Sequence, residues 1–238
     1  MKIAAPQQST LQEEIPLLLQ QLPVRGARIV ELGCGKAEKT RALASSGLVG
    51  EIVAFEVDAI QHALNLRVTD LPNVRFRHGG AQAIPEADAS VDIVMMFKSL
   101  HHVPVADMDR ALDEIWRVLK PGGHAWISEP VFAGELNEVM RLFHDEQVVR
   151  EAAFAALSRA VAVGRFALQQ QFFFNTATRF KDFAEFDARM IRVTHSNHEL
   201  SPDLYQQVQA AFAPHLTAEG ARFLTPQRVD WLQKPERS

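Results

Sequence analysis

Short apolar runs alternate with amphipathic segments along the first 130 residues. The sequence predicts strands at Arg28–Leu32, Glu51–Val57, Val74–His78, Val91–Phe97 and His124–Ser128, and the apolar runs at Arg28–Leu32 and Val91–Phe97 predict buried ones. Apolar residues at helical spacing predict helices at Thr10–Leu22, Lys36–Ser46, Ala59–Val68 and Asp107–Leu119. Asp58 is the predicted N-cap of the third helix, and Lys120–Gly123 (KPGG) predicts the end of the fourth. This alternation predicts a doubly wound, mostly parallel α/β sheet.

The pattern changes after Pro130. Two further strands are predicted, at Gln170–Phe174 and Ala221–Leu232, which brings the sheet to seven strands. Further helices are predicted at Glu135–Ala162 (one long helix or two shorter ones), Phe180–Arg192 and Pro202–Phe212. We expect one domain over residues 1–238, with a ligand-binding core at 24–130 and a helical lid inserted at 131–195. Ten of the fifteen phenylalanines fall between Phe132 and Phe186. They form either the core beneath these extra helices or an apolar lid that bounds a substrate pocket.

Composition excludes several classes of protein. The formal net charge of −4 argues against a nucleic-acid partner, because phosphate binding usually needs a basic face. Cys34 is the only cysteine, so no intrachain disulfide can form, and a reducing compartment is indicated. No signal-peptide core follows the N-terminus, and the longest apolar runs are far shorter than the ~20 residues of a membrane span. We therefore expect a cytoplasmic protein without a membrane partner.

The turn Gly33–Gly35 and the acid Glu56 follow the first two predicted strands, at the edge where such sheets bind ligands. A glycine turn before a helix lets backbone N–H groups approach a ligand. Glu38 occupies the third glycine position of a dinucleotide motif and would repel a pyrophosphate, which disfavours NAD or FAD. Glu56 can accept hydrogen bonds from both hydroxyls of a bound ribose. The alternatives are that Glu56 simply faces solvent, or that Asp58 binds the ribose instead. A nucleoside with an amino-acid tail fits best.

Several segments in order resemble the class I S-adenosylmethionine-dependent methyltransferases. They are Ile29–Lys36 (IVELGCGK), Ala54–Asp58 (AFEVD), Gly80–Pro85 (GAQAIP) with Ser90–Val94 (SVDIV), Ser99–Val103 (SLHHV) and Glu114–Gly123 (EIWRVLKPGG). The resemblance covers Ile29–Ser128 and is closest to the small-molecule branch that includes quinone-biosynthesis enzymes. It implies a Rossmann-like fold, S-adenosyl-L-methionine as cofactor, and methyl transfer to a small, partly apolar acceptor.

The resemblance also implies roles for individual residues. Gly33, Cys34 and Gly35 would line the methionine tail of the cofactor, and Glu31 would order their loop. Glu56 would bind the ribose, Val57 would face the adenine, and Gly80, Ala81 and Gln82 would lie at the adenine edge. Phe97 and Lys98 would close the methionine end of the site. Ala81 stands where the family usually has an aspartate, and Gln82 or a backbone carbonyl is the candidate substitute. Lys36 and Lys98 are unusual near the positively charged sulfonium of this cofactor. Each must therefore reach a carboxylate or turn to solvent.

Candidate catalytic residues follow the fourth strand. His101 and His102 lie where an acceptor would sit, and histidine titrates in the range a base needs. The alternative is that they cap or pack the loop. His144, His195 and His198 are interpreted as surface or structural residues, and no metal site is expected, since nothing near the last two completes a ligand set. The functional alternatives are an inactive nucleoside-binding or assembly protein with the same fold and, less favoured, an NAD-dependent oxidoreductase.

Overall fold

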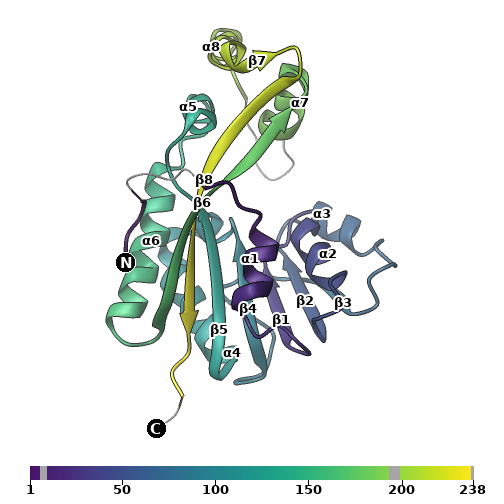
Figure 1. Cartoon of the computed structure of the whole chain (residues 1–238), viewed down its shortest axis with the longest axis vertical. Helices are drawn as coiled ribbons and strands as arrows, with labels where there is room; N and C mark the ends of the chain where they lie inside the picture. Colours follow the sequence, from purple (N-terminus) through teal and green to yellow (C-terminus); the bar gives the residue numbers. More distant parts are fainter. Residues whose placement is uncertain (6–9, 193–198, 237–238) are drawn as a thin grey trace.

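A single twisted sheet runs through the molecule (Figure 1). The computed structural model describes residues 1–5, 10–192 and 199–236. The strands are β1 (Arg28–Leu32), β2 (Glu51–Glu56), β3 (Val74–His78), β4 (Val91–Phe97), β5 (Leu119–Pro130), β6 (Ala167–Phe180), β7 (Leu216–Thr217) and β8 (Gly220–Gln233). Their order is β3-β2-β1-β4-β5-β8-β6, and the short β7 pairs with β8. Neighbours among the first five strands are parallel, whereas β8 is antiparallel to β5 and β6. The predicted mostly parallel, Rossmann-like sheet is confirmed: seven strands form the main path, and β7 adds a short eighth strand at β8.

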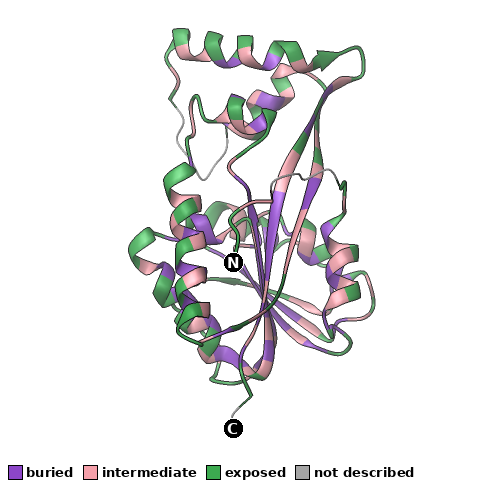
Figure 2. Cartoon of the chain, turned by 60° about the vertical axis from the view of Figure 1, so that its left-hand side comes forward, coloured by how far each residue is buried: buried purple, intermediate pink, exposed green. Residues whose placement is uncertain are grey.

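Helices cover both faces of this sheet. They are α1 (Glu14–Gln21), α2 (Glu38–Ala44), α3 (Ala59–Asn65), α4 (Met108–Val118), α5 (Glu135–Met140), α6 (Gln147–Ala162), α7 (Phe183–Phe186) and α8 (Pro202–Phe212), with short turns η1 (Leu100–His102), η2 (Val105–Asp107), η3 (Asp187–Ile191) and η4 (Ala213–His215). Successive residues of β1 point to opposite faces, so Ile29 joins the core under α1 and α2, and Val30 joins the core under α4 and α6. Figure 2 shows the buried positions concentrated along the strands.

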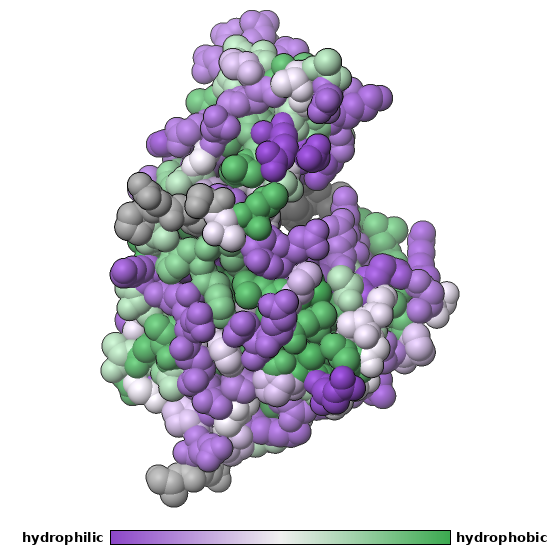
Figure 3. Space-filling model, viewed as in Figure 1, coloured by the Kyte–Doolittle hydropathy of each residue, from purple (hydrophilic) through white to green (hydrophobic). Residues whose placement is uncertain are grey.

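The long strands β6 and β8 extend beyond the α/β body and carry a second core. Their distal ends, with α5, α7 and α8, form a separate lobe that we call the head (Figure 1). Phe180 contacts the rings of Phe186, Phe212 and Phe223, and all four side chains are almost fully buried. The molecular outline narrows between the head and the body (Figure 3). For these rings the interpretation as a core beneath extra helices is confirmed.

The segment expected to form a helical lid contains a much longer strand than its pattern predicted. β6 occupies fourteen of its residues and pairs with β8 from Ala167 to Phe180. The sequence indicated only Gln170–Phe174 as a strand, because the flanking residues alternate less clearly. Their strand conformation is set by pairing with β8, which lies far away in the chain.

Local signals located most element ends well. β1, β3, β4 and α8 have the predicted bounds. The predicted helix at Glu135–Ala162 is two helices, α5 and α6. α4 ends at Val118 as expected, but the glycine-rich segment after it is already part of β5, with an irregular register opposite Val91 and Ile93. Across the described ranges, every helix is too short or too polar to span a bilayer.

Candidate active site

The loop between β1 and α2 combines one tightly packed glycine with one that faces open space. Gly33 and Gly35 both adopt positive φ angles, of 75° and 51°. A Cβ atom on Gly33 would lie 2.7 Å from Cβ of Ser99, so only glycine fits there. A Cβ on Gly35 would meet nothing within 4 Å. The loop therefore leaves room for a ligand at the carboxyl end of β1, as the glycine motif predicted.

Glu56 ends β2 and links it to this loop. Its Oε2 accepts a hydrogen bond from the Gly35 N–H at 2.7 Å, and its Oε1 accepts from the N–H groups of Val57 and Asp58 at 2.8 and 2.9 Å. The side chain is only 7% exposed, so these bonds hold the carboxylate in one orientation. Of these three hydrogen bonds, Oε2 accepts only the one from Gly35, so it can still accept a further hydrogen bond from a hydroxyl group.

The two acids at this strand end have different tasks. Oδ1 of Asp58 accepts from the N–H groups of Ile60 and Gln61 at 2.8 and 3.3 Å, which confirms its predicted role as the cap of α3. Val57 lies between the acids with its apolar side chain 59% exposed. An exposed valine beside an oriented carboxylate places an apolar surface next to a hydrogen-bond acceptor, a combination common in small-molecule sites.

The predicted adenine edge lies next to Val57. A Cβ on Gly80 would come within 2.6 Å of Oε1 of Gln82 and 3.2 Å of Cγ1 of Val57, so the Gln82 amide folds over Gly80. Ala81 is 5% exposed. The amide oxygen of Gln82 thus lies at this edge and is the side-chain acceptor available in place of the missing aspartate.

A buried acidic pair lies behind the glycine loop. Glu31 accepts a hydrogen bond from Oγ1 of Thr40 at 2.7 Å, which ties β1 to α2. Burial raises the pKa of Glu31 to about 7, against the lowering effect of the Thr40 hydrogen bond. Glu14 of α1 is also buried, accepts from Nε1 of Trp126 and lies 3.6 Å from Nζ of Lys39. The sequence pattern did not indicate Glu14, because it occupies a polar position of an amphipathic helix.

Lys98 occupies a strained position at the end of β4. Its φ of 55° is unusual for a residue with a side chain, and its N–H donates to the carbonyl of Ser128 at 2.7 Å. The side chain is solvent-accessible, yet protein surrounds it closely enough that burial lowers the pKa of Lys98. Both observations fit a lysine standing in a concave site. Lys36, in contrast, is exposed, and Phe97 is half-buried.

Cys34 has no reactive thiolate. Its side chain is buried and reduced, and burial raises the pKa of the thiol well above its usual range. Nδ2 of Asn65 lies 3.5 Å from its sulfur. The residue fills the turn as a small apolar side chain.

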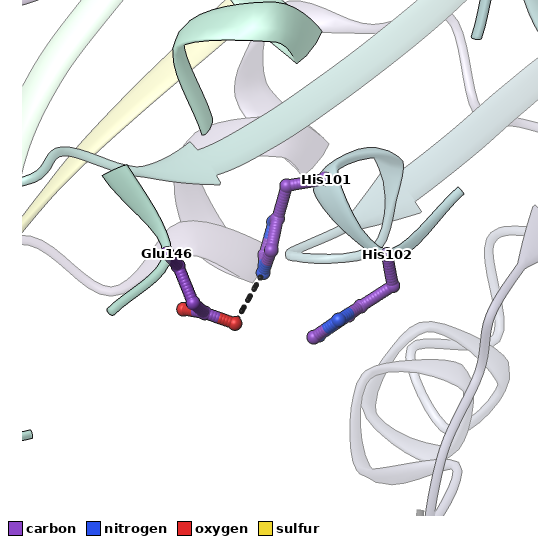
Figure 4. A group of neighbouring side chains, drawn as sticks. All are labelled: His101, His102 and Glu146. Carbon is purple, nitrogen blue, oxygen red and sulfur yellow. Dashed lines mark ion pairs between the residues drawn. The ribbon is translucent and has the colours of Figure 1, made fainter. Parts of the chain in front are cut away.

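His101 and His102 lie in η1, directly after β4. Nδ1 of His101 is hydrogen-bonded to Oε2 of Glu129, whose Oε1 accepts from the N–H of Leu100 at 2.9 Å. Nε2 of His101 lies 3.5 Å from Oε1 of Glu146 (Figure 4). Burial by itself lowers the pKa of His101, but the two carboxylates outweigh it and raise the pKa to about 9. His101 therefore carries a proton at neutral pH.

Glu146 reaches the site from the start of α6. Its Oε1 is 2.8 Å from Nε2 of His144, and its Oε2 accepts from Arg150 at 2.6 Å. These cationic and hydrogen-bonding neighbours hold the pKa of Glu146 well below its usual range, although burial opposes them. His102 is exposed, and its ring centroid lies 4.1 Å from that of His101.

The sequence predicted the histidines but not their partners. Glu129 is the penultimate residue of β5 and so lies at the carboxyl end of this strand. Nothing local marked Glu146, which belongs to a segment without recognisable motifs. His195 and His198 lie outside the described residues. A separate hollow of about 430 Å³, lined in part by Arg25, Lys120 and His124, lies at the opposite edge of the sheet and contains none of the predicted site residues.

A Rossmann-like sheet with a glycine loop after β1 and an oriented acid after β2 is an arrangement also found in nucleotide-binding α/β domains. Residues 30–127 match the family model described as a methyltransferase domain. This segment, which is less than half of the chain, is therefore similar in sequence to methyltransferase domains.

Individual relatives agree with this assignment. The chain is 38% identical over 102 residues to an uncharacterized methyltransferase of Mycobacterium bovis, covering 43% of this chain and 39% of that protein. It is 33% identical over 117 residues to the ubiquinone/menaquinone biosynthesis C-methyltransferase UbiE of Legionella pneumophila, covering 46% of each. The match thus spans less than half the length of either relative.

A third relative is similar over most of the chain. The uncharacterized methyltransferase YcgJ of Bacillus subtilis is 27% identical over 203 residues, which is 78% of each chain. Its crystal structure superposes with a TM-score of 0.66 at 19% identity, covering 94% of this chain and 98% of that one. This likeness shows that the α/β fold is shared.

Proposed function

We propose that the chain transfers the methyl group of S-adenosylmethionine to a small molecule. The observation that carries the proposal is the pairing of Glu56 with Gly35, which places an oriented carboxylate beside open space in the glycine loop. The methyltransferase family match over residues 30–127 supports the same reaction. The net charge of −4 supports a small acceptor over a nucleic acid.

The residues at the strand ends fit the parts of this cofactor. Glu56 would accept from the ribose hydroxyls, Val57 would face the adenine, and Gln82 would accept from its amino group. The methionine tail carries both an ammonium and a carboxylate. The acidic side chains of Glu31 and Glu14 would attract the ammonium group of the tail, and the amine of Lys98 would attract its carboxylate. When bound, S-adenosylmethionine supplies a methyl group already activated by a sulfonium, and S-adenosylhomocysteine remains afterwards.

The acceptor would lie near His102 and Glu146, beyond the methionine end. His101 is already protonated and cannot accept a further proton, so the exposed His102 is the better candidate base. Most phenylalanines of the head pack against each other and do not line this region. The partly apolar character of the acceptor therefore rests on two half-buried rings, Phe97 beside Lys98 and Phe132, which lies under Arg150.

A two-stage experiment tests the proposal. First, thermal denaturation is followed with S-adenosylhomocysteine and, as a control, with NADH. We expect only S-adenosylhomocysteine to raise the melting temperature, because a ligand of the native state stabilises it by mass action. Second, the protein is incubated with a metabolite extract and S-adenosylmethionine labelled in its methyl group, and the labelled product is identified.

Each outcome separates the functions considered. A labelled small molecule that forms with the wild type and not with Glu56→Ala supports methyl transfer. Binding of S-adenosylhomocysteine without any labelled product would favour an inactive nucleoside-binding or assembly protein. Stabilisation by NADH alone would overturn the cofactor assignment.

A further inference from the structure

Three side chains from two distant segments converge on one space beside the proposed methyl-transfer site. Figure 4 shows His101 and His102 of η1 and Glu146 at the start of α6 pointing toward each other. One nitrogen of each histidine and one carboxylate oxygen lie within 4.8 Å of one another. His101 and Glu146 are buried, and His102 is exposed, so the space can be reached from solvent.

His101 and Glu146 form an ion pair whose length is compatible with an ion bound between them. Nε2 of His101 is 3.5 Å from Oε1 of Glu146, longer than a direct hydrogen bond. The same carboxylate is held by Arg150 at 2.6 Å and by His144 at 2.8 Å, so shorter contacts are attainable in this cluster. Two ligand atoms bound tetrahedrally at 2.0–2.1 Å from one ion lie about 3.3 Å apart. The observed distance is close to that spacing.

The surroundings of His101 match those of a metal-bound histidine. A ligating imidazole usually donates its second N–H to a carboxylate, which fixes the tautomer and the ring orientation. His101 makes this contact through Nδ1 to Glu129, and Glu129 is itself held by the N–H of Leu100. Nε2 is thereby directed toward Glu146. Glu146 is oriented in turn by Arg150 and His144.

We propose that Nε2 of His101, a ring nitrogen of His102 and Oε1 of Glu146 form a binding site for one divalent first-row transition metal ion. Two imidazoles and one carboxylate suit Zn²⁺, Co²⁺ or Fe²⁺ and are a poor set for Mg²⁺ or Ca²⁺, which prefer oxygen ligands. Three protein ligands leave at least one coordination position open, as in catalytic metal sites.

The open position would bind an acceptor oxygen and lower its pKa, so that the metal ion would take the place of His102 as the activating group and the acceptor class would be a hydroxyl or enol. This second part rests on the proposed function, whereas metal binding rests on geometry alone. The test therefore measures metal binding without cofactor or acceptor. Calorimetric titration of the same sample with S-adenosylhomocysteine checks the cofactor site independently.

The experiment titrates the full chain, free of any polyhistidine tag, with Co²⁺ as the probe. We expect one Co²⁺ per chain and the visible absorption of an imidazole-ligated ion. His102→Ala should weaken binding at least tenfold, and because His102 is exposed this variant should fold. Glu129→Gln should weaken binding roughly 10- to 100-fold by releasing the His101 ring.

The matched control is the pair His62 and His78, whose rings lie 5.7 Å apart on the far side of β2 from η1. The double variant His62→Ala/His78→Ala should bind Co²⁺ like the wild type. The proposal is overturned if the wild type shows an imidazolium–carboxylate pair only, with no stoichiometric Co²⁺ binding. It is also overturned if His102→Ala binds as tightly as the wild type, or if the control variant loses the site.

Discussion

The N–H of Gly35 donates a hydrogen bond of 2.7 Å to Oε2 of Glu56, joining the loop after β1 to the end of β2. This bond means that the acid and the glycine loop form one unit, because movement of either displaces the other. The same carboxylate also accepts the N–H groups of Val57 and Asp58. Cofactor affinity should therefore depend on Glu56 through direct contact and through the position of the loop.

The first prediction compares the two acids at the end of β2. Glu56→Ala should weaken S-adenosylhomocysteine binding about tenfold or more, since a charge-assisted hydrogen bond contributes about 1.5–3 kcal/mol. Glu56→Gln should lose less, because its amide oxygen still accepts. Asp58→Ala should cost roughly 1 kcal/mol of stability with little change in affinity, because Asp58 caps α3. Calorimetry and thermal denaturation measure both quantities. Lost affinity in Asp58→Ala alone would reassign the ribose to Asp58.

The second prediction uses two glycines that differ in location but not in conformation. Gly35 and Gly47 have φ angles of 51° and 67°, and a Cβ on either would meet nothing within 4 Å. Alanine at each should cost about 1–2 kcal/mol of stability through left-handed backbone strain. Only Gly35→Ala should also weaken S-adenosylhomocysteine binding, because its methyl group enters the proposed site. Equal losses of affinity in the two variants would indicate a global effect and argue against a site at Gly35.

The third prediction concerns pH and the buried Glu31. Its pKa is about 7 in the folded protein and about 4.5 in the unfolded chain. Between these values the folded protein keeps a proton that the unfolded chain releases, so the free energy of unfolding falls as pH rises, by about 3 kcal/mol in total. Glu31→Gln cannot titrate and should lack this component. Urea denaturation of both proteins at about pH 5 and about pH 8 measures the difference. Parallel pH profiles would show that Glu31 ionises normally.

The fourth prediction tests the role of the head. Phe212 is 1% exposed and contacts Phe180, Phe183 and Phe186. Phe212→Ala should cost about 3–5 kcal/mol of stability by leaving a cavity, with S-adenosylhomocysteine affinity unchanged in the folded protein. Phe132→Ala is the control: its ring is half-buried and should cost less. A small effect of Phe212→Ala would mean that the head can collapse around the missing ring.

Local patterns in the sequence determined much of the fold. The bounds of β1 and β4 follow from apolar runs, and the cap at Asp58 follows from one side chain and its neighbouring N–H groups. Such features depend on residues within one turn or one strand, so the sequence alone specifies them. Glu56 was predicted as a site residue from its place at a strand end, because parallel strands bring their carboxyl ends to one edge of the sheet.

Only the tertiary structure decided which distant residues meet. The pairing of β6 with β8 lengthened a five-residue signal into a fourteen-residue strand and placed the phenylalanines in a core of their own. Glu129 and Glu146 come from β5 and from the start of α6, yet both contact His101. Contacts of this kind depend on strand order and helix placement, which emerge from the packing of the whole chain and leave no local pattern.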